Sequence, residues 1–151
     1  MVNFWTYKKE YRKYRKTIIS KIDRTLSQGS IFFGDELKRF EKNFLKTNNS
    51  RYGIAVGSGT DALLISLMAL GIKKGDQVIT AANTAIPTIS AIINAGATPK
   101  LVDIDDDYLI DLNKIEKEIN SKTKAIIPVH LYGQSCQMDK LLKIAKKNKI
   151  K

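Results

Sequence analysis

The sequence predicts an α/β protein in which a mainly parallel sheet is flanked by helices and preceded by two further helices. From residue 52 onward, short apolar runs rich in Val and Ile alternate with stretches of helical period. The connections between them are short and contain glycine, asparagine or aspartate. Strand–helix alternation of this kind favours parallel pairing, because a parallel strand needs a crossover connection to return to the same edge of the sheet.

The first part of the chain, residues 1–51, is predicted to be a helical segment that precedes the α/β domain. Residues 9–26 carry apolar side chains at steps of three and four, which is the period of an amphipathic helix. A second helix is expected from Asp35, whose side chain can cap its N-terminus. Its apolar stripe consists of Leu37, Phe40 and Phe44. We expect the two helices to pack against each other.

Residues 52–151 are predicted to form the α/β domain. We expect strands at residues 52–56, 77–81, 99–102 and 125–129. We expect helices at residues 60–70, 86–94, 112–119 and 138–147. The helix at 60–70 is apolar on nearly every face, so burial on several sides is expected. Residues 149–151 resemble the first residues of another strand, and the domain is therefore expected to be incomplete within this sequence.

Composition limits the function classes. The net charge is +11, but the lysines are spread along the chain and few aromatic residues lie among them. A solvated lysine surface is therefore expected in place of a nucleic-acid site. No apolar run approaches the ~18 residues of a membrane span, so no membrane partner is expected. A single cysteine, Cys136, allows no internal disulfide and favours the cytoplasm.

The sequence Gly57-Ser58-Gly59-Thr60 joins a predicted strand to the predicted apolar helix. At such a junction the first N–H groups of the helix have no partner and lie at the positive end of the helix dipole. Glycine lets the backbone approach an anion closely, and the two hydroxyl groups add donors. The turn therefore predicts a phosphate site, although glycine and serine also occur in such turns for conformational reasons alone.

A longer block around this turn, residues 52–63 (YGIAVGSGTDAL), resembles the N-terminal signature of the DegT/StrS-type (DegT/DnrJ) sugar aminotransferases. The resemblance extends in order through residues 75–79, 82–84, 96–99, 102–105 and 128–134. Gly34 and Phe40-Glu41 are similar to the segment that precedes the signature in that family. Several linked blocks are far more specific than any one of them.

The resemblance implies an aspartate-aminotransferase-type fold (PLP fold type I), of which this chain is the N-terminal part of the large domain. It also implies the cofactor pyridoxal 5′-phosphate (PLP), whose phosphate Ser58, Gly59 and Thr60 would hold. Asp61 is either a further contact or a first-turn carboxylate favoured by the helix dipole. Ala85 occupies the position at which the family often carries an aromatic residue stacked on the pyridine ring.

The residues that do the chemistry in the resembled family follow the segment that this chain covers. They are a lysine that forms a Schiff base and an acidic residue that holds the pyridine nitrogen protonated. No catalytic residue is therefore assigned here, and this chain alone is expected to be inactive. The complete enzyme is expected to be a homodimer that uses a nucleotide-linked keto-sugar and an amino-acid donor in amino-sugar and polysaccharide biosynthesis. The alternatives are a non-catalytic phosphate-binding or regulatory protein derived from this fold, and an unrelated small phosphate-binding α/β domain with a basic surface.

Other polar residues invite functional readings. His130 ends a predicted strand, where active sites of parallel sheets gather, but we expect a structural, hydrogen-bonded histidine. Cys136 is expected to be an ordinary residue at a helix start. The acidic run at 103–107 lacks the spacing of a calcium loop and is expected to be a solvated turn. Asn83 and Thr84 line the same cleft as the phosphate site or, more simply, cap the following helix.

Overall fold

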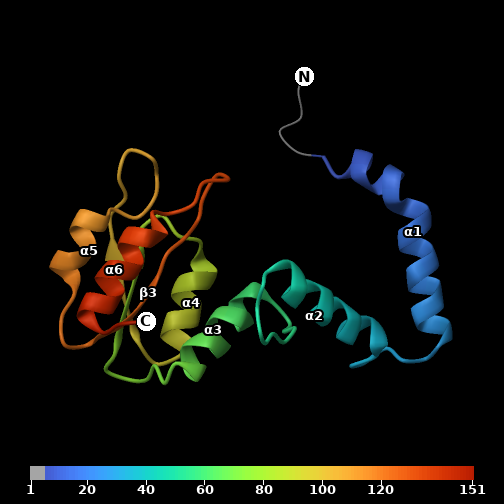
Figure 1. The fold of residues 1–151 in the computed structure, drawn as a ribbon, viewed down its shortest axis with the longest axis horizontal. Helices are drawn as coiled ribbons and strands as arrows, with labels where there is room; N and C mark the ends of the chain where they lie inside the picture. Colours follow the sequence, from blue (N-terminus) through green and yellow to red (C-terminus); the bar gives the residue numbers. More distant parts are fainter. Residues whose placement is uncertain (1–5) are drawn as a thin grey trace. The chain divides into compact units, whose positions relative to one another are not determined.

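The computed structural model describes residues 6–151. The chain divides into two compact units between Ala55 and Val56, each of which is described by itself (Figure 1). This division lies four residues beyond the boundary expected from the sequence. The first unit is helical, and the second contains the whole sheet.

The helices of the first unit form where the sequence predicts them. They are α1 (Lys8–Ser27) and α2 (Asp35–Thr47). The predicted packing between them is wrong, because no described side chain of either helix is buried, and an ion pair from Arg24 to Glu36 links them instead. Asp35 does not cap α2, since Gly34 holds the cap position and Asp35 is the first helical residue, 3.4 Å from the Lys38 ammonium.

The segment that joins the two units is not a strand, and the strand predicted at residues 52–56 is wrong. The Ala55 N–H donates a 2.8 Å hydrogen bond to the Glu41 carboxylate on α2, not to a neighbouring strand. Leu45 lies so close to Gly53 that a Cβ there would come within 2.8 Å of its methyl group. Both contacts attach the segment to α2, which explains why the first unit extends to Ala55.

The second unit contains a three-stranded, fully parallel sheet in the order β2-β1-β3. Its strands are β1 (Gln77–Ala81), β2 (Thr98–Val102) and β3 (Thr123–Ile127). Its helices are α3 (Gly59–Ala69), α4 (Ile86–Asn94), α5 (Leu112–Glu118) and α6 (Met138–Asn148). Each lies within two residues of the expected bounds, which confirms the predicted parallel sheet flanked by helices.

Helices cover both faces of this sheet (Figure 1). Alternate side chains of β1 point to opposite faces, as the pleat requires. Val78 joins the core beneath α3 and α4, whereas Ile79 joins the core beneath α5 and α6. Both side chains are fully buried. Thr80 is also buried, and its hydroxyl donates a 2.9 Å hydrogen bond to the Ile127 carbonyl, so the sheet leaves no buried side-chain polar atom unpaired in the described part of the chain.

Two features of the second unit concern its surface. Burial of α3 on several sides was predicted, but only Leu67 is buried, while Ile65 and Met68 are 47% and 61% exposed. At the outer edge of β3, Lys151 donates to the Lys124 carbonyl and accepts from the Ile126 N–H, as a residue of a parallel strand would. Residues 149–151 are not assigned to a strand, so the strand expected there stays a prediction.

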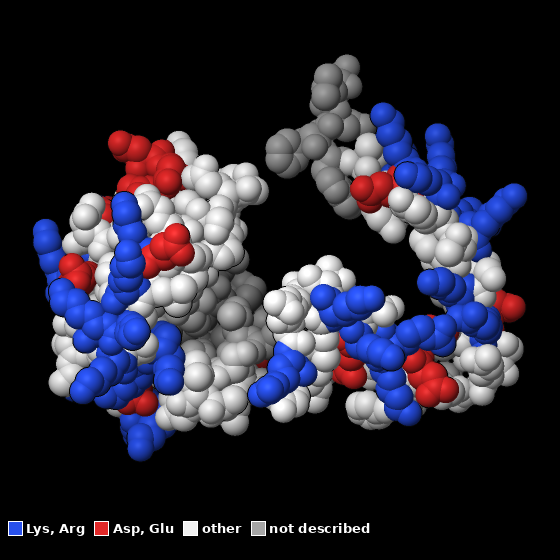
Figure 2. Space-filling model, viewed as in Figure 1, with Lys and Arg blue, Asp and Glu red and all other residues white. Residues whose placement is uncertain are grey.

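The basic side chains lie on the surface, as expected from their spread along the sequence. Figure 2 shows lysine and arginine side chains over both units. Within residues 6–151, no helix is both long and apolar enough to cross a membrane.

Candidate phosphate site at the start of α3

The N-terminus of α3 lies at the edge of the sheet where the strands end. After α3 the chain turns at Gly71 and enters β1 at its amino end. A helix of 11 residues and a strand of five each span about 16 Å, so the start of α3 returns to the carboxyl edge. Ligands of open parallel sheets bind at this edge.

Ser58 and Asp61 fix the first turn of α3 as a reciprocal cap. The Ser58 hydroxyl accepts a 3.1 Å hydrogen bond from the Asp61 N–H and donates one of 2.9 Å to the Asp61 carboxylate. The Ser58 carbonyl accepts from the Ala62 N–H at 3.0 Å. The bond from Ala62 is the first within the helix, so of the four N–H groups at the helix start that lack an intrahelical partner, those of residues 58–61, only that of Asp61 is satisfied within the described chain. The Asp61 carboxylate is held by Ser58, as a first-turn carboxylate would be.

The N–H groups of Gly59 and Thr60, the first two residues of the helix, have no acceptor among the described residues. The Thr60 hydroxyl likewise makes no hydrogen bond within that part of the chain, and the residue is half-buried. A Cβ placed on Gly59 would meet nothing within 4 Å, so the space over the turn is open. At Gly57 a Cβ would lie 3.0 Å from the Asp61 carboxylate and would disturb the cap.

These groups fit a phosphate monoester. Two N–H groups and one hydroxyl can donate to its oxygens, and the helix dipole favours its negative charge. The one carboxylate at the turn is already paired with a hydroxyl group. The donor groups of this turn therefore fit the phosphate group of PLP.

Ala85 lies at the same edge of the sheet, four residues after the end of β1. It holds the cap position of α4, is exposed, and has no side chain that could cap. The capping role expected for Asn83 and Thr84 is wrong. The Asn83 amide donates to the Tyr108 carbonyl at 3.0 Å, and the Thr84 hydroxyl donates to that of Thr88 at 2.9 Å. Both side chains instead brace the loop that carries Ala85.

His130 and Cys136 form a structural pair in the loop after β3. The Cys136 N–H donates to Nδ1 of His130 at 3.1 Å, which confirms the structural role predicted for the histidine. The Cys136 thiol donates to the Val129 carbonyl at 3.3 Å and is buried. Burial raises the pKa of this thiol, so the reactive thiolate is disfavoured. Cys136 lies two residues before α6 and not within its first turn.

The acidic run at residues 103–107 is the tip of a small hairpin closed by the bridge between Ile104 and Ile110. Its carboxylates are exposed, as expected of a solvated turn. Lys114 donates a 3.0 Å hydrogen bond to Asp103 and lowers the pKa of that carboxyl group. No group of three or more His, Cys, Asp or Glu side chains in residues 6–151 is arranged to hold a metal ion.

Comparison with known proteins agrees with this geometry. A profile of the DegT/DnrJ/EryC1/StrS aminotransferase family matches residues 12–151. The chain belongs to this family. One relative, dTDP-3-amino-3,6-dideoxy-alpha-D-galactopyranose transaminase from Aneurinibacillus thermoaerophilus, is 43% identical over 152 aligned residues. The match covers 100% of this chain and 42% of that protein.

Solved structures of family members have the same fold. DesV from S. venezuelae superimposes with a TM-score of 0.95 at 36% identity, covering 99% of this chain and 40% of DesV. NtdA from Bacillus subtilis, solved with bound cofactor PMP, gives 0.89 at 39% identity, covering 92% of this chain and 32% of NtdA. This chain thus has the fold of the PLP fold type I sugar aminotransferases. It spans about 40% of the length of the curated relatives that it matches.

Proposed function

We propose that residues 56–151 provide the phosphate-binding part of a PLP site in an aminotransferase. Ser58, Gly59, Thr60 and Asp61 form its phosphate-binding turn, and Ala85 lies where the pyridine ring would pass. The observation that carries the proposal is the pair of N–H groups at Gly59 and Thr60, which have no acceptor in the described part of the chain and lie above an open turn. Family membership supports the choice of PLP over other phosphates.

The residues of the turn have separate roles. Gly59 and Thr60 donate their N–H groups to the phosphate, and Thr60 adds its hydroxyl. Ser58 and Asp61 hold the first turn of α3 in the geometry that exposes these donors. Ala85 places only a methyl group at its position, so the face of the ring is covered by a side chain from elsewhere. When bound, the cofactor supplies the aldehyde and the electron-accepting ring for amino-group exchange.

We further propose that the complete protein transfers an amino group from an amino acid to a nucleotide-linked keto-sugar in amino-sugar and polysaccharide biosynthesis. The names of its relatives support this substrate class, since several are transaminases of dTDP- or UDP-linked sugars. A buried free thiol favours the reducing cytoplasm.

A homodimer is part of the same proposal. Exposed apolar side chains on α1 and α2, including Leu26, Phe40 and Phe44, need a cover in solution. A second copy can provide it. Sedimentation equilibrium measures the mass directly, and a monomer at micromolar concentration would contradict a homodimer.

The test of the phosphate site is a Thr60→Val variant of the full-length protein. Valine keeps the shape of threonine but removes the hydroxyl donor. Losing a hydrogen bond to a charged group costs about 1.5–3 kcal/mol, which is roughly ten- to a hundredfold in affinity. The ligand is pyridoxine 5′-phosphate, which lacks the aldehyde and so cannot react with the lysines of the surface. Its dissociation constant is measured by isothermal titration.

The control is Thr17→Val, which removes an exposed hydroxyl on α1. We expect its dissociation constant to equal that of the unaltered protein. An unchanged constant for Thr60→Val would mean that this hydroxyl does not contact the phosphate. Binding that is absent even in the unaltered protein would overturn the site as a whole.

A further inference from the structure

Three loops meet at the carboxyl edge of the sheet and are braced to one another by side-chain amides. They follow β1, β2 and β3. The Asn83 amide donates to the Tyr108 carbonyl at 3.0 Å, which ties the first loop to the second. The Gln134 amide donates to the Asp107 carbonyl at 3.2 Å, which ties the third loop to the second. These two hydrogen bonds join the three loops into one rim.

The second loop places a tyrosine where turn geometry favours glycine. The Tyr108 N–H donates to the Asp105 carbonyl, and the Asp105 N–H donates to the Leu109 carbonyl, which closes a three-residue hairpin loop. The last residue of such a loop adopts a left-handed conformation that glycine or asparagine normally supplies. Tyr108 holds this position with a φ of 64°.

The third loop also places a tyrosine at a turn position that favours glycine. The Gln134 N–H donates to the Leu131 carbonyl at 2.9 Å across a tight turn. Its two central residues, Tyr132 and Gly133, have φ values of 56° and 77°, as in a type I′ turn. Glycine, asparagine or aspartate is usual at the first of these positions, and Tyr132 holds it here. Both tyrosines thus adopt a backbone conformation that disfavours L side chains with a bulky Cβ substituent.

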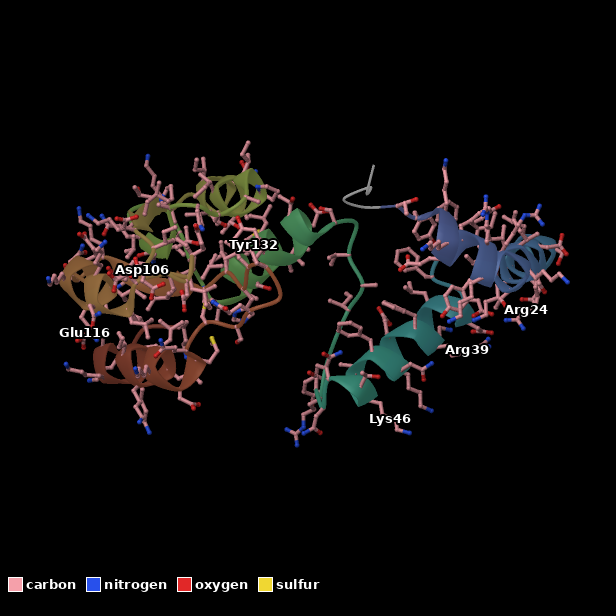
Figure 3. The ribbon with its side chains drawn as sticks, turned by 90° about the horizontal axis from the view of Figure 1, so that it is seen from above. Arg24, Arg39, Lys46, Asp106, Glu116 and Tyr132 are labelled. Carbon is pink, nitrogen blue, oxygen red and sulfur yellow. The ribbon has the colours of Figure 1, made fainter. Side chains whose placement is uncertain are left out.

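Burial does not compensate for this strain. Tyr108 and Tyr132 are 59% and 83% exposed, and their rings meet edge to face with centroids 6.0 Å apart at 84°. Together with Asp106, Asp107 and Gln134 they line a hollow at the rim. Asp106 and Tyr132, from different loops, are labelled in Figure 3. Strained residues whose side chains do not pack into a core are typical of binding sites.

We propose that the Tyr108–Tyr132 corner, defined by these two rings, binds the sugar ring of the substrate. A sugar ring presents C–H groups on its faces, which pack on an aromatic ring, and hydroxyl groups around its rim. Asp106, Asp107 and Gln134 can hydrogen-bond those hydroxyls. The carboxylates repel phosphate, so the diphosphate of a nucleotide-sugar lies away from this corner. This inference rests on the proposed function, whose substrate contact it specifies.

The experiment compares nucleotide-sugars with bare nucleotides on the full-length protein. Isothermal titration gives dissociation constants for dTDP-glucose and dTDP, and for UDP-glucose and UDP. In the unaltered protein we expect the sugar to strengthen binding of at least one nucleotide by about fivefold or more. Tyr132→Ala should abolish that difference and leave the bare nucleotide unaffected. Tyr132→Phe, which keeps the ring, should retain most of it.

Tyr132→Asn provides a second readout, because asparagine suits the turn but lacks the ring. We expect it to bind like Tyr132→Ala while raising the midpoint of thermal unfolding. Tyr52→Ala, which removes an exposed tyrosine of the first unit, serves as the matched control and should bind both ligands normally.

Several results would overturn the proposal: no sugar-dependent gain in the unaltered protein, a gain that survives Tyr132→Ala, or an equal loss for nucleotide and nucleotide-sugar. The last would mean that the ring contacts the base or the diphosphate. Binding of pyridoxine 5′-phosphate is measured in parallel. If the unaltered protein binds it, the proposed phosphate site stands even where the sugar contact fails.

Discussion

The two units of the chain reach helical structure in different ways. In the second unit, every helix contributes at least one buried side chain to a core on one face of the sheet. In the described part of the first unit, α1 and α2 bury none. Both units nevertheless form helices at the positions that sequence periodicity predicts.

This difference in burial distinguishes helices that tertiary packing stabilises from helices that rest on local sequence preferences. Helical period and favourable end residues define where a helix forms, but isolated helices are marginal in water without packing. The second unit has a core of its own. The first unit presents apolar stripes that are complete in sequence and uncovered within residues 6–55. Its stability therefore depends on whatever covers those stripes in solution.

The largest expected effect comes from a pair of isoleucine variants, one in each unit. Ile79→Ala should lower the free energy of unfolding by about 2–5 kcal/mol, because Ile79 is fully buried in the central strand. Ile22→Ala, at a residue 49% exposed on α1, should change it by less than about 0.5 kcal/mol in the monomer, and by more only where a second copy covers α1. Urea denaturation followed by circular dichroism gives both values. A loss at Ile22 as large as that at Ile79 would break the comparison and indicate that α1 is covered in solution.

A smaller effect is expected at two aspartates that begin helices. The Asp111 carboxylate caps α5 by accepting a 2.8 Å hydrogen bond from the Asn113 N–H, so Asp111→Ala should cost about 1 kcal/mol. Asp35 makes no cap bond at the start of α2. Asp35→Ala should therefore cost only the dipole contribution and the exposed ion pair with Lys38, about 0.5 kcal/mol together. Chemical denaturation of the two variants checks the order, and a larger loss at Asp35 would contradict the assignment of the caps.

The smallest expected effect is a titration at the hairpin tip of the second unit. A side-chain hydrogen bond with Asp107 raises the pKa of Asp105 above its ordinary value of 3.8. Because the folded pKa is raised, the bond is present at low pH and is lost as the pH rises through that pKa. Carboxyl carbon NMR measures the titration directly. Asp107→Asn should lower the pKa of Asp105, and an unaltered midpoint would mean that the two side chains do not share a proton.

Sequence periodicity predicted the elements that a core stabilises. The three strands of the sheet and the four helices around it lie within two residues of the predicted bounds. Their apolar residues recur with the period of a strand or of a helix because these residues pack into the core. The segment 52–56 carries a similar apolar pattern but forms no strand. A pattern specifies a face to bury, whereas a strand also needs a partner, which this segment lacks among the described residues.

The candidate site was predictable only in part. The Gly-Ser-Gly-Thr turn indicated open N–H groups, and the structure has them at Gly59 and Thr60. The brace from Asn83 to Tyr108 was not predictable, because it joins loops 25 residues apart. Nor did any pattern place Tyr108 and Tyr132 together, since turn preferences assign their positions to glycine or asparagine. Residues that oppose a local preference are the ones that local rules miss.

The strand order also has a consequence for how the protein folds as it is made. β1, the first strand of the described sheet to be made, occupies its centre, and Val78 pairs with Pro99 on one side and with Ala125 on the other. The second partner lies more than twice as far along the chain as the first. Each new strand therefore meets an edge that already exists, and Lys151 in turn adds to the edge that β3 has just formed. Synthesis from the N-terminus and growth of the described sheet proceed in the same order, so β1 waits only for β2, and β3 can pair as soon as it is made.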